Sequence, residues 1–165
     1  MNKPFYILVT LLALLCSASV FAGAQKKADE ATAQWRYDVE DIGKTGKQGT
    51  VMFKVWSYSK KDNIAISQAD KNAVHAVLFK GVGTTRPIVD PSTAEKHADF
   101  FDRFFQEGGG YHRYVQLSNN GAVKPEDRIK LKKEYKIGIV VIVKKDELRK
   151  YLETEGIVAK LGGMF

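Results

Sequence analysis

Few residues in this chain have side chains that could catalyse a reaction or hold a metal ion, and they are scattered. The three histidines are His75, His97 and His112, and no two of them lie at metal-ligand spacing on one predicted element. The sequence contains no serine elbow, no zinc-protease helix and no complete dinucleotide loop. We therefore predict a protein that is not an enzyme, with no catalytic residue, no bound metal and no cofactor. An enzyme site that the fold assembles from separated residues such as His97, Asp99 and His112 is the third-ranked alternative.

Basic residues give the clearest pattern of a single chemical type. Arg128, Lys130 and Lys132 alternate with apolar residues, so that a strand would carry them on one face. With the cations near the predicted last helix they form the basic strip: Arg128, Lys130, Lys132, Lys144, Lys145, Arg149 and Lys150. Lysines on an edge strand commonly prevent pairing with other chains, and a cationic strip can also bind an anionic ligand. The first interpretation is favoured and the second is kept.

The charge of the whole chain limits the classes of partner. There are 26 Lys and Arg residues against 19 Asp and Glu residues, which gives a net charge of +7. Such a balance favours anionic surfaces such as lipopolysaccharide, phospholipid headgroups or a cell-wall polysaccharide. Nucleic acid is disfavoured as a partner, because we identify no aromatic platform for a single strand in an exported protein.

Four phenylalanines lie close together on one predicted helix. Phe100 and Phe104 form one stripe, and Phe101 and Phe105 form a second stripe beside it. Aromatic pairs at this spacing normally belong to the core. Two adjacent stripes make an unusually wide apolar face, so Phe100 and Phe104 are candidates for contact with a partner.

The first 22 residues have the pattern of a cleavable secretory signal peptide. Lys3 precedes an apolar run over residues 5–15, and small residues follow. Cys16 fits lipoprotein cleavage poorly, because Ala13 and Leu15 reverse the large and small residues that this pattern requires. We predict ordinary cleavage, with lipidation at Cys16 as the alternative.

The remainder of the chain is predicted to be exported and soluble. Residues 23–34 are polar without an apolar period, which indicates a flexible leader, and residues 35–165 are predicted to form a single domain. No cysteine follows residue 22. Small exported domains of eukaryotes commonly carry disulfides, so we expect the periplasm or outer envelope of a bacterium.

Residue periodicity divides this domain into strands and helices. The predicted strands cover residues 35–40, 50–58, 111–117, 128–132 and 135–143, with a possible edge strand at 157–161. The predicted helices cover residues 62–80, 92–107 and 146–155, with N-caps at Asp62, at Ser92 in a capping box with Glu95, and at Asp146. Residues 135–143 are apolar on both faces, which predicts a central strand covered on both sides. Runs of strands indicate an α+β fold, a mostly antiparallel sheet with two longer helices and a short C-terminal helix packed on it.

The segment pattern resembles a family of envelope domains. It consists of Val55-Trp56-Ser57-Tyr58, the alanines at positions 65, 69, 73 and 76, the strand from Tyr135 to Val143, and the segment from Leu148 to Ile157. This resembles the small envelope α+β domains of the FlgT N-terminal and related outer-membrane lipoprotein type, and uncharacterised exported proteins of Bacteroidetes. The resemblance covers roughly residues 50–157 and implies a binding or scaffolding role, with no catalytic residue.

The first-ranked function is accordingly a non-enzymatic module of the bacterial envelope. It would bind an envelope protein partner, or assemble with it, through a sheet edge or the phenylalanine helix. The second-ranked function is a periplasmic binder of an anionic polymer or lipid that uses the basic strip.

Overall fold

The computed structural model describes residues 29–31, 34–43 and 46–162. The predicted signal peptide, with Cys16, and most of the predicted leader lie outside these residues. Within the described part of the chain, no helix has the length and apolar character needed to cross a membrane.

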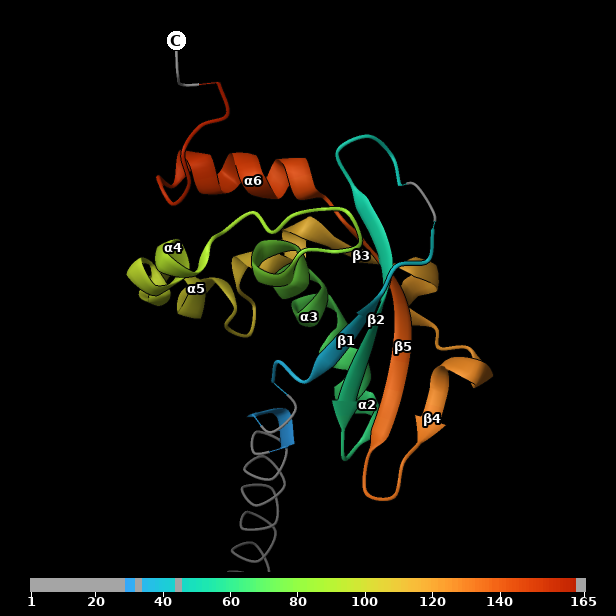
Figure 1. Cartoon of the computed structure of the whole chain (residues 1–165). Coiled ribbons are helices and arrows are strands. Elements are labelled where there is room, and N and C mark those ends of the chain that lie inside the picture. Colours follow the sequence, from blue (N-terminus) through green and yellow to red (C-terminus); the bar gives the residue numbers. More distant parts are fainter. Residues whose placement is uncertain (1–28, 32–33, 44–45, 163–165) are drawn as a thin grey trace, which may run out of the picture.

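Five strands of the described chain form one antiparallel sheet with β5 at its centre (Figure 1). The strands are β1 (Tyr37–Glu40), β2 (Val51–Ser59), β3 (Val115–Leu117), β4 (Arg128–Lys130) and β5 (Tyr135–Val143). β5 pairs with β2 on one side, and on the other side with β4 near its start and β3 near its end. β1 pairs with the outer side of β2. Together with the helices, this sheet confirms the predicted α+β fold.

The alanine-rich segment after β2 lies against the sheet as three short pieces, where one helix was expected. These are α2 (Asp62–Ser67), α3 (Ala69–His75) and a π-helical turn (Ala76–Lys80). The first break falls at Gln68, whose ψ of −9° departs from the helical value of about −42°. The four alanines of the ridge are all buried, as expected for a helix lying close to a sheet: Ala65, Ala69, Ala73 and Ala76. The expected Asp62 cap is wrong, because Lys61 is the N-cap residue and the Asp62 carboxylate accepts the N–H of Asn63.

The phenylalanine segment is also divided into two short helices. They are α4 (Pro91–Lys96) and α5 (Ala98–Phe104). The expected capping box at Ser92 is wrong, because the N-cap lies two residues earlier, at Asp90. The Asp90 carboxylate accepts the Thr93 N–H and also the hydroxyls of Ser92 and Thr93. These three hydrogen bonds lower the pKa of Asp90 to about 2, with the Thr93 N–H as the largest cause.

Short 3₁₀ turns connect the later elements. They are η2 (Gly110–Tyr114), η3 (Ser118–Gly121) and η4 (Pro125–Asp127), and the last helix is α6 (Lys145–Thr154). The strand expected from residue 111 therefore begins only at Val115. Tyr111 and Tyr114 are both buried at the three-residue spacing that a 3₁₀ helix brings onto one side. Asp146 lies in the first turn of α6, whose N-cap residue is Lys144, and no strand forms over residues 157–161.

The described helices cover only one face of the sheet. On β5, the side chains of Ile137, Ile139, Val141 and Val143 are at most 2% exposed. Val140, at an alternate position on the same strand, is only half-buried. α2 and α3 lie on the buried side (Figure 1). β5 is central as predicted, whereas the expected layer over its second face is not found among the described α-helices.

Candidate functional site

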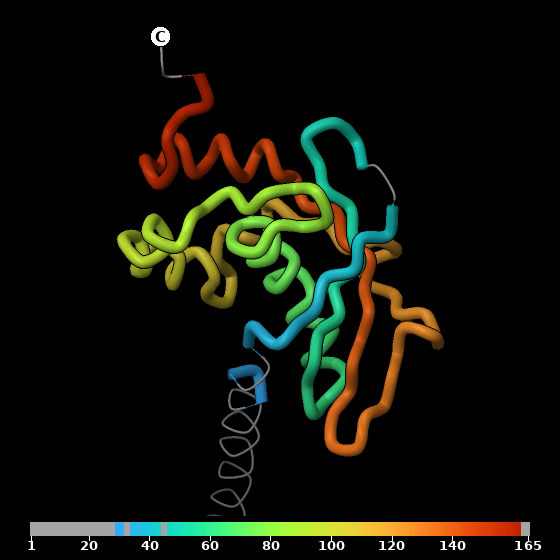
Figure 2. Tube along the Cα trace, viewed as in Figure 1, coloured from blue at the N-terminus to red at the C-terminus, as the bar shows by residue number. Residues whose placement is uncertain are grey.

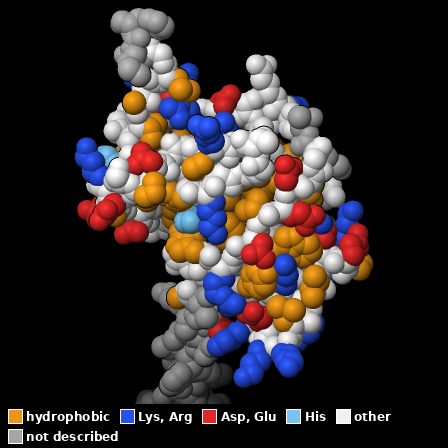
Figure 3. Space-filling model, viewed as in Figure 1, with side chains coloured by type: hydrophobic (Ala, Val, Ile, Leu, Met, Phe, Trp, Pro, Cys, Tyr) orange, Lys and Arg blue, Asp and Glu red, His pale blue; other side chains and the backbone are white. Residues whose placement is uncertain are grey.

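The uncovered side of the sheet carries an unusual mixture of aromatic, aliphatic and charged side chains. Its residues, here called the open face, are Asp38, Glu40, Met52, Lys54, Trp56, Tyr58, Gln116, Ile129, Lys136, Gly138, Val140 and Ile142. They arise from period-two alternation, because Phe53, Val55 and Ser57 occupy the buried positions between them on β2. Hydrophobic side chains gather over the strands, with Lys and acidic side chains among them (Figure 3). An antiparallel sheet commonly presents polar residues on its solvated face, so this apolar content indicates a contact surface.

Trp56 is the central side chain of the open face, and its position depends on a glycine. Trp56 on β2 is the register partner of Gly138 on β5. A Cβ added at position 138 would lie 2.8 Å from Cζ3 and 2.9 Å from both Cε3 and Cη2 of Trp56. The benzo ring of the indole therefore lies across β5 at the one position where that strand has no side chain.

Two carboxylates on the edge strand β1 fix the aromatic rings. The indole N–H of Trp56 donates to Oε2 of Glu40 over 2.7 Å. The hydroxyl of Tyr58 donates to Oδ2 of Asp38 over 2.5 Å. Each polar group of the two rings thus has a partner within the sheet, which holds the rings in one orientation before any ligand arrives.

Two lysines lie between the rings and the carboxylates. Lys54 Nζ is 2.7 Å from Oδ1 of the buried Asp127, and Lys136 Nζ is 3.2 Å from Oδ2 of Asp38. The same ammonium groups lie 5.2 and 5.1 Å from the centroid of the Trp56 ring, within the range of a cation–π interaction. The stems of both lysines thus add to the apolar area, and their ammonium groups lie beside the indole of Trp56.

These contacts favour the charged forms of Lys54, Lys136 and Asp38. The hydrogen bond to Asp127 raises the pKa of Lys54, and the hydrogen bond to Tyr58 is the largest cause that raises the pKa of Lys136. The Tyr58 hydroxyl is likewise the largest cause that lowers the pKa of Asp38. Two ammonium groups therefore face three carboxylates, those of Asp38, Glu40 and Asp127. The face has no excess of positive charge, although the chain carries a net charge of +7.

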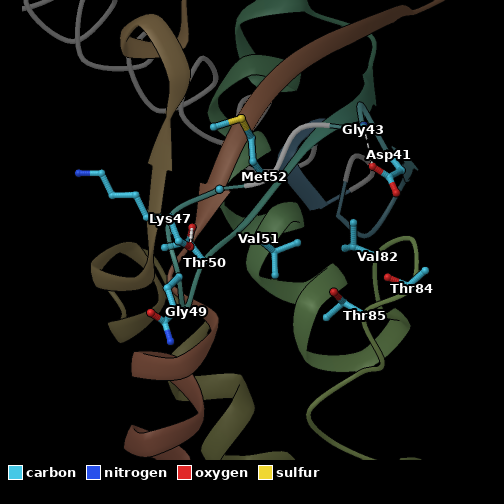
Figure 4. A pocket seen from close by; sticks show the side chains of 12 residues that line it. Asp41, Gly43, Lys47, Gly49, Thr50, Val51, Met52, Val82, Thr84 and Thr85 are labelled. Carbon is cyan, nitrogen blue, oxygen red and sulfur yellow. Dashed lines mark hydrogen bonds between the residues drawn. The ribbon is translucent and has the colours of Figure 1, made fainter.

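Three hollows elsewhere in the described chain offer weaker sites. The first, of about 490 Å³, lies between the loop before β2 and residues 82–85 (Figure 4). Two of its polar side chains are already engaged, since Asp41 accepts the N–H of Gly43 and Thr50 donates to the carbonyl of Lys47. The Lys47 side chain extends away from the hollow (Figure 4). The two hydrogen bonds stabilise the turn itself, so these groups do not require a ligand as partner.

The second hollow, of about 520 Å³, lies beside a cluster of aromatic rings at the start of the domain. Trp35 stacks on His75 with ring centroids 3.9 Å apart, and Phe79 and Phe105 contact the same histidine. The Tyr37 hydroxyl lies 2.7 Å from His75 Nδ1. Trp35 has a φ of 61°, which a bulky residue rarely adopts. These rings therefore pack against one another, as in a hydrophobic core.

The third hollow, of about 540 Å³, has a contact between His112 and Asp70 at its rim. Nδ1 of His112 lies 2.7 Å from Oδ2 of Asp70, and the His112 ring is tilted against the Tyr111 ring with centroids 3.9 Å apart. The contact recorded for His112 is thus with Asp70, a residue that the sequence analysis did not select, in place of the expected partners His97 and Asp99. In the described ranges, no group of three His, Cys, Asp or Glu residues could hold a metal ion.

The residues of the basic strip do not form one surface. Arg128 and Lys130 lie on β4, and Lys132 follows this strand, so these three lie beside the start of β5. The other four lie at the N-cap of α6 or within it, beyond the end of β5 (Figure 2). β5 separates the two groups, and its eight residue steps from Tyr135 to Val143 span about 27 Å at 3.4 Å per step. Several of these cations also have partners: Arg128 pairs with Asp62, Lys144 with Glu147 and Arg149 with Glu153. Lys145 is half-buried, and Lys132 and Lys150 are exposed.

The two phenylalanines selected as contact residues are engaged with other rings. Phe104 is 4% exposed, and Phe100 is half-buried. Both rings stack or tilt against Tyr151 of α6, at centroid distances of 6.0 and 6.1 Å. Neither ring is freely exposed, so the phenylalanine face joins α5 to α6 within the domain.

The residues of the open face were not predicted from the sequence, although two signals point to them. Lys54, Trp56 and Tyr58 occupy alternate positions of their strand and so share one face of the sheet. The small or apolar Val55 and Ser57 lie on the opposite face. Gly138 interrupts an otherwise apolar strand, which is typical of a place where another group approaches the backbone.

Comparison with protein-family models, with curated proteins and with solved structures finds no match to this chain.

Proposed function

We propose that this chain is an exported, non-catalytic binding module of the bacterial envelope, and that its ligand docks on the open face of the sheet. The observation that carries the proposal is the fixed position of Trp56. Its indole lies across Gly138 and donates to Glu40, so the ring is oriented without a ligand. Orientation of a half-exposed aromatic group before binding reduces the entropy that binding costs.

The absence of a described helix on this face supports the same assignment. Apolar side chains without a cover mark interaction surfaces, and here Met52, Val140, Ile142 and Ile129 extend the apolar area around Trp56. Catalysis is supported less, because no group of metal-ligating side chains in the described residues accompanies the His112–Asp70 pair.

The proposed location outside the cytoplasm rests on the N-terminal sequence pattern. Mass spectrometry of the protein from its native host should find an N-terminus at Gly23 or Gln25. A diacylated Cys16 would contradict this and would place the protein on a membrane.

Binding of an anionic polymer or lipid through the basic strip is the second candidate. It is supported by the net charge of +7. It is weakened by the division of the strip into two groups about 27 Å apart, beyond the Debye length of about 8 Å at physiological salt.

Co-sedimentation with isolated native envelope tests the proposed surface. The protein should appear in the pellet, and Trp56→Ala should reduce the pelleted fraction strongly. Leu161→Ala is the matched control, because Leu161 is the most exposed large apolar residue described, at 76%, and lies outside the open face. Equal sedimentation of both variants and the wild type would place the ligand on another surface.

A further inference from the structure

The size of the open face limits what can dock there. From the row of Tyr58 to the row of Met52 the face is about 20 Å long, and its strands span about 14 Å across. This is a footprint of roughly 300 Å², which is small for a stable protein interface, since such an interface buries about 800 Å² of accessible surface on each partner. The face therefore fits a single extended chain better than it fits a folded protein.

Charge and hydrogen bonding limit the chemistry of that chain. Lys54 and Lys136 already have carboxylate partners, so an anionic polymer would find no free ammonium group on this face and would meet three carboxylates. An extended peptide binds a sheet through main-chain hydrogen bonds at an edge strand, and the open face offers side chains only. A neutral chain rich in hydroxyl groups avoids both difficulties.

The groups that the face does offer match such a chain. The π face of an indole is electron-rich and attracts polarised C–H groups, which line the flat side of a pyranose ring. Glu40 uses Oε2, and Asp38 uses Oδ2, for the contacts within the sheet. Each carboxylate thus keeps a second oxygen that can accept a hydroxyl proton. Both residues are exposed and lie on β1, next to the Trp56 strand.

Building on the proposed function, we propose that the ligand of the open face is a neutral glycan chain. One sugar ring stacks on Trp56, and its hydroxyls donate to Asp38 and Glu40. The neighbouring sugar units lie along β2 and β5, over Tyr58 at one end and Met52 at the other. Gly138 is a positioning residue, because it lets the indole lie flat against the sheet.

Titration with defined glycans tests this assignment. The chain has two tryptophans, Trp35 and Trp56, so a Trp35→Phe variant reports Trp56 fluorescence alone. The probes are cellohexaose, chitohexaose, laminarin and xylan, with alginate as the anionic comparator. We expect a saturable change in Trp56 emission with at least one neutral probe. The affinity should be nearly independent of salt, since no net charge is neutralised.

Calorimetry on variants with native Trp35 separates the role of the ring from that of its support. Trp56→Ala should weaken binding of the neutral probe by about tenfold or more, the loss of a stacked aromatic contact. Gly138→Ala retains the indole but displaces it, and should weaken binding by a smaller factor. Lys130→Glu, on the helix side of β4, should leave the affinity unchanged. Circular dichroism verifies that each variant is folded.

The outcomes distinguish this inference from the proposed function. Binding of alginate alone with a steep salt dependence would overturn the neutral-glycan assignment, as would glycan binding that Trp56→Ala does not alter. If no neutral probe binds but Trp56→Ala still abolishes co-sedimentation with the envelope, the glycan assignment fails and the proposed surface stands. If co-sedimentation is also unaffected, both fail.

Discussion

Trp56 lies over Gly138 so closely that a methyl group at position 138 would meet the indole 2.8 Å from Cζ3. Contacts of Cβ atoms at this distance require the ring to shift. Gly138 itself has no positive φ, so its backbone would accept alanine. The glycine is therefore needed for the ring above it and not for the strand that contains it.

This relationship predicts a change of sign in a double-mutant cycle. In the wild type, displacement of Trp56 should offset the gain of about 0.5–1 kcal/mol that alanine normally has over glycine in a strand. In a Trp56→Ala background the displaced ring is absent, so Gly138→Ala should be stabilising. Urea denaturation of the four proteins should give a coupling energy of about 1 kcal/mol. Equal effects in both backgrounds would show that the ring does not lie over Gly138.

Two adjacent valines of β5 should respond in opposite ways to the same substitution. Val141 is fully buried between Phe53 and Leu117 of the neighbouring strands, so Val141→Asp should abolish soluble expression, at a cost of several kcal/mol. Val140 faces the open side and is the register partner of Lys54. Val140→Asp should therefore fold, with a stability within about 1 kcal/mol of the wild type. Loss of both variants from the soluble fraction would mean that the second face of β5 is covered.

Much of the fold follows from the sequence because strand parity and small-residue spacing are strong constraints. The β-branched and aromatic residues between positions 51 and 58 predict β2, and the alanine ridge predicts the segment that covers it. The predicted start of α4 is wrong because Asp90, Ser92 and Thr93 are all residue types that can cap a helix N-terminus. The hydrogen bonds in the folded structure identify Asp90 as the cap.

The candidate site was harder to predict because its residues come from different strands. Nothing local in the sequence places Gly138 beneath Trp56. The two residues are 82 positions apart (138 − 56), and only the register of the β2–β5 pair brings them together. Apolar residues on both sides of β5 predicted a second covering layer. The same pattern also arises when one side is left for a ligand, and the sequence alone does not separate these cases.

His75 should make the stability of the domain depend on pH between about 4 and 6.5. Burial is the largest cause that lowers the His75 pKa to about 4 from its ordinary value of 6.5, and Lys80 and Lys71 act in the same direction. The Tyr37 hydroxyl faces its Nδ1. The unfolded chain therefore binds more protons in this range. The contribution of His75 to stability is complete above pH 6.5 and is lost as the pH falls towards 4.

Chemical denaturation across this range measures the effect. The slope due to His75 cannot exceed about 1.4 kcal/mol per pH unit, the value for one proton. His75→Phe keeps an aromatic ring in the cluster and should flatten the slope between these pH values. An unchanged slope in this variant would assign the pH dependence to other groups.

Reversing charges on the basic strip should leave envelope binding nearly unchanged at about 150 mM salt. Lys130 and Lys132 lie at the β4 end of the sheet, and the remaining cations lie about 27 Å away around α6. Charges this far apart are screened from one another, and a single exposed pair contributes about 0–1 kcal/mol. The Lys130→Glu, Lys132→Glu double variant should therefore co-sediment within about twofold of the wild type, since a loss of about 0.4 kcal/mol corresponds to that factor. Two results together would instead make an anionic polymer or lipid the ligand: strong loss of binding in the double variant, and wild-type binding that weakens steeply as the salt concentration is raised. Such a salt dependence is expected because each phosphate or carboxylate contact releases counterions.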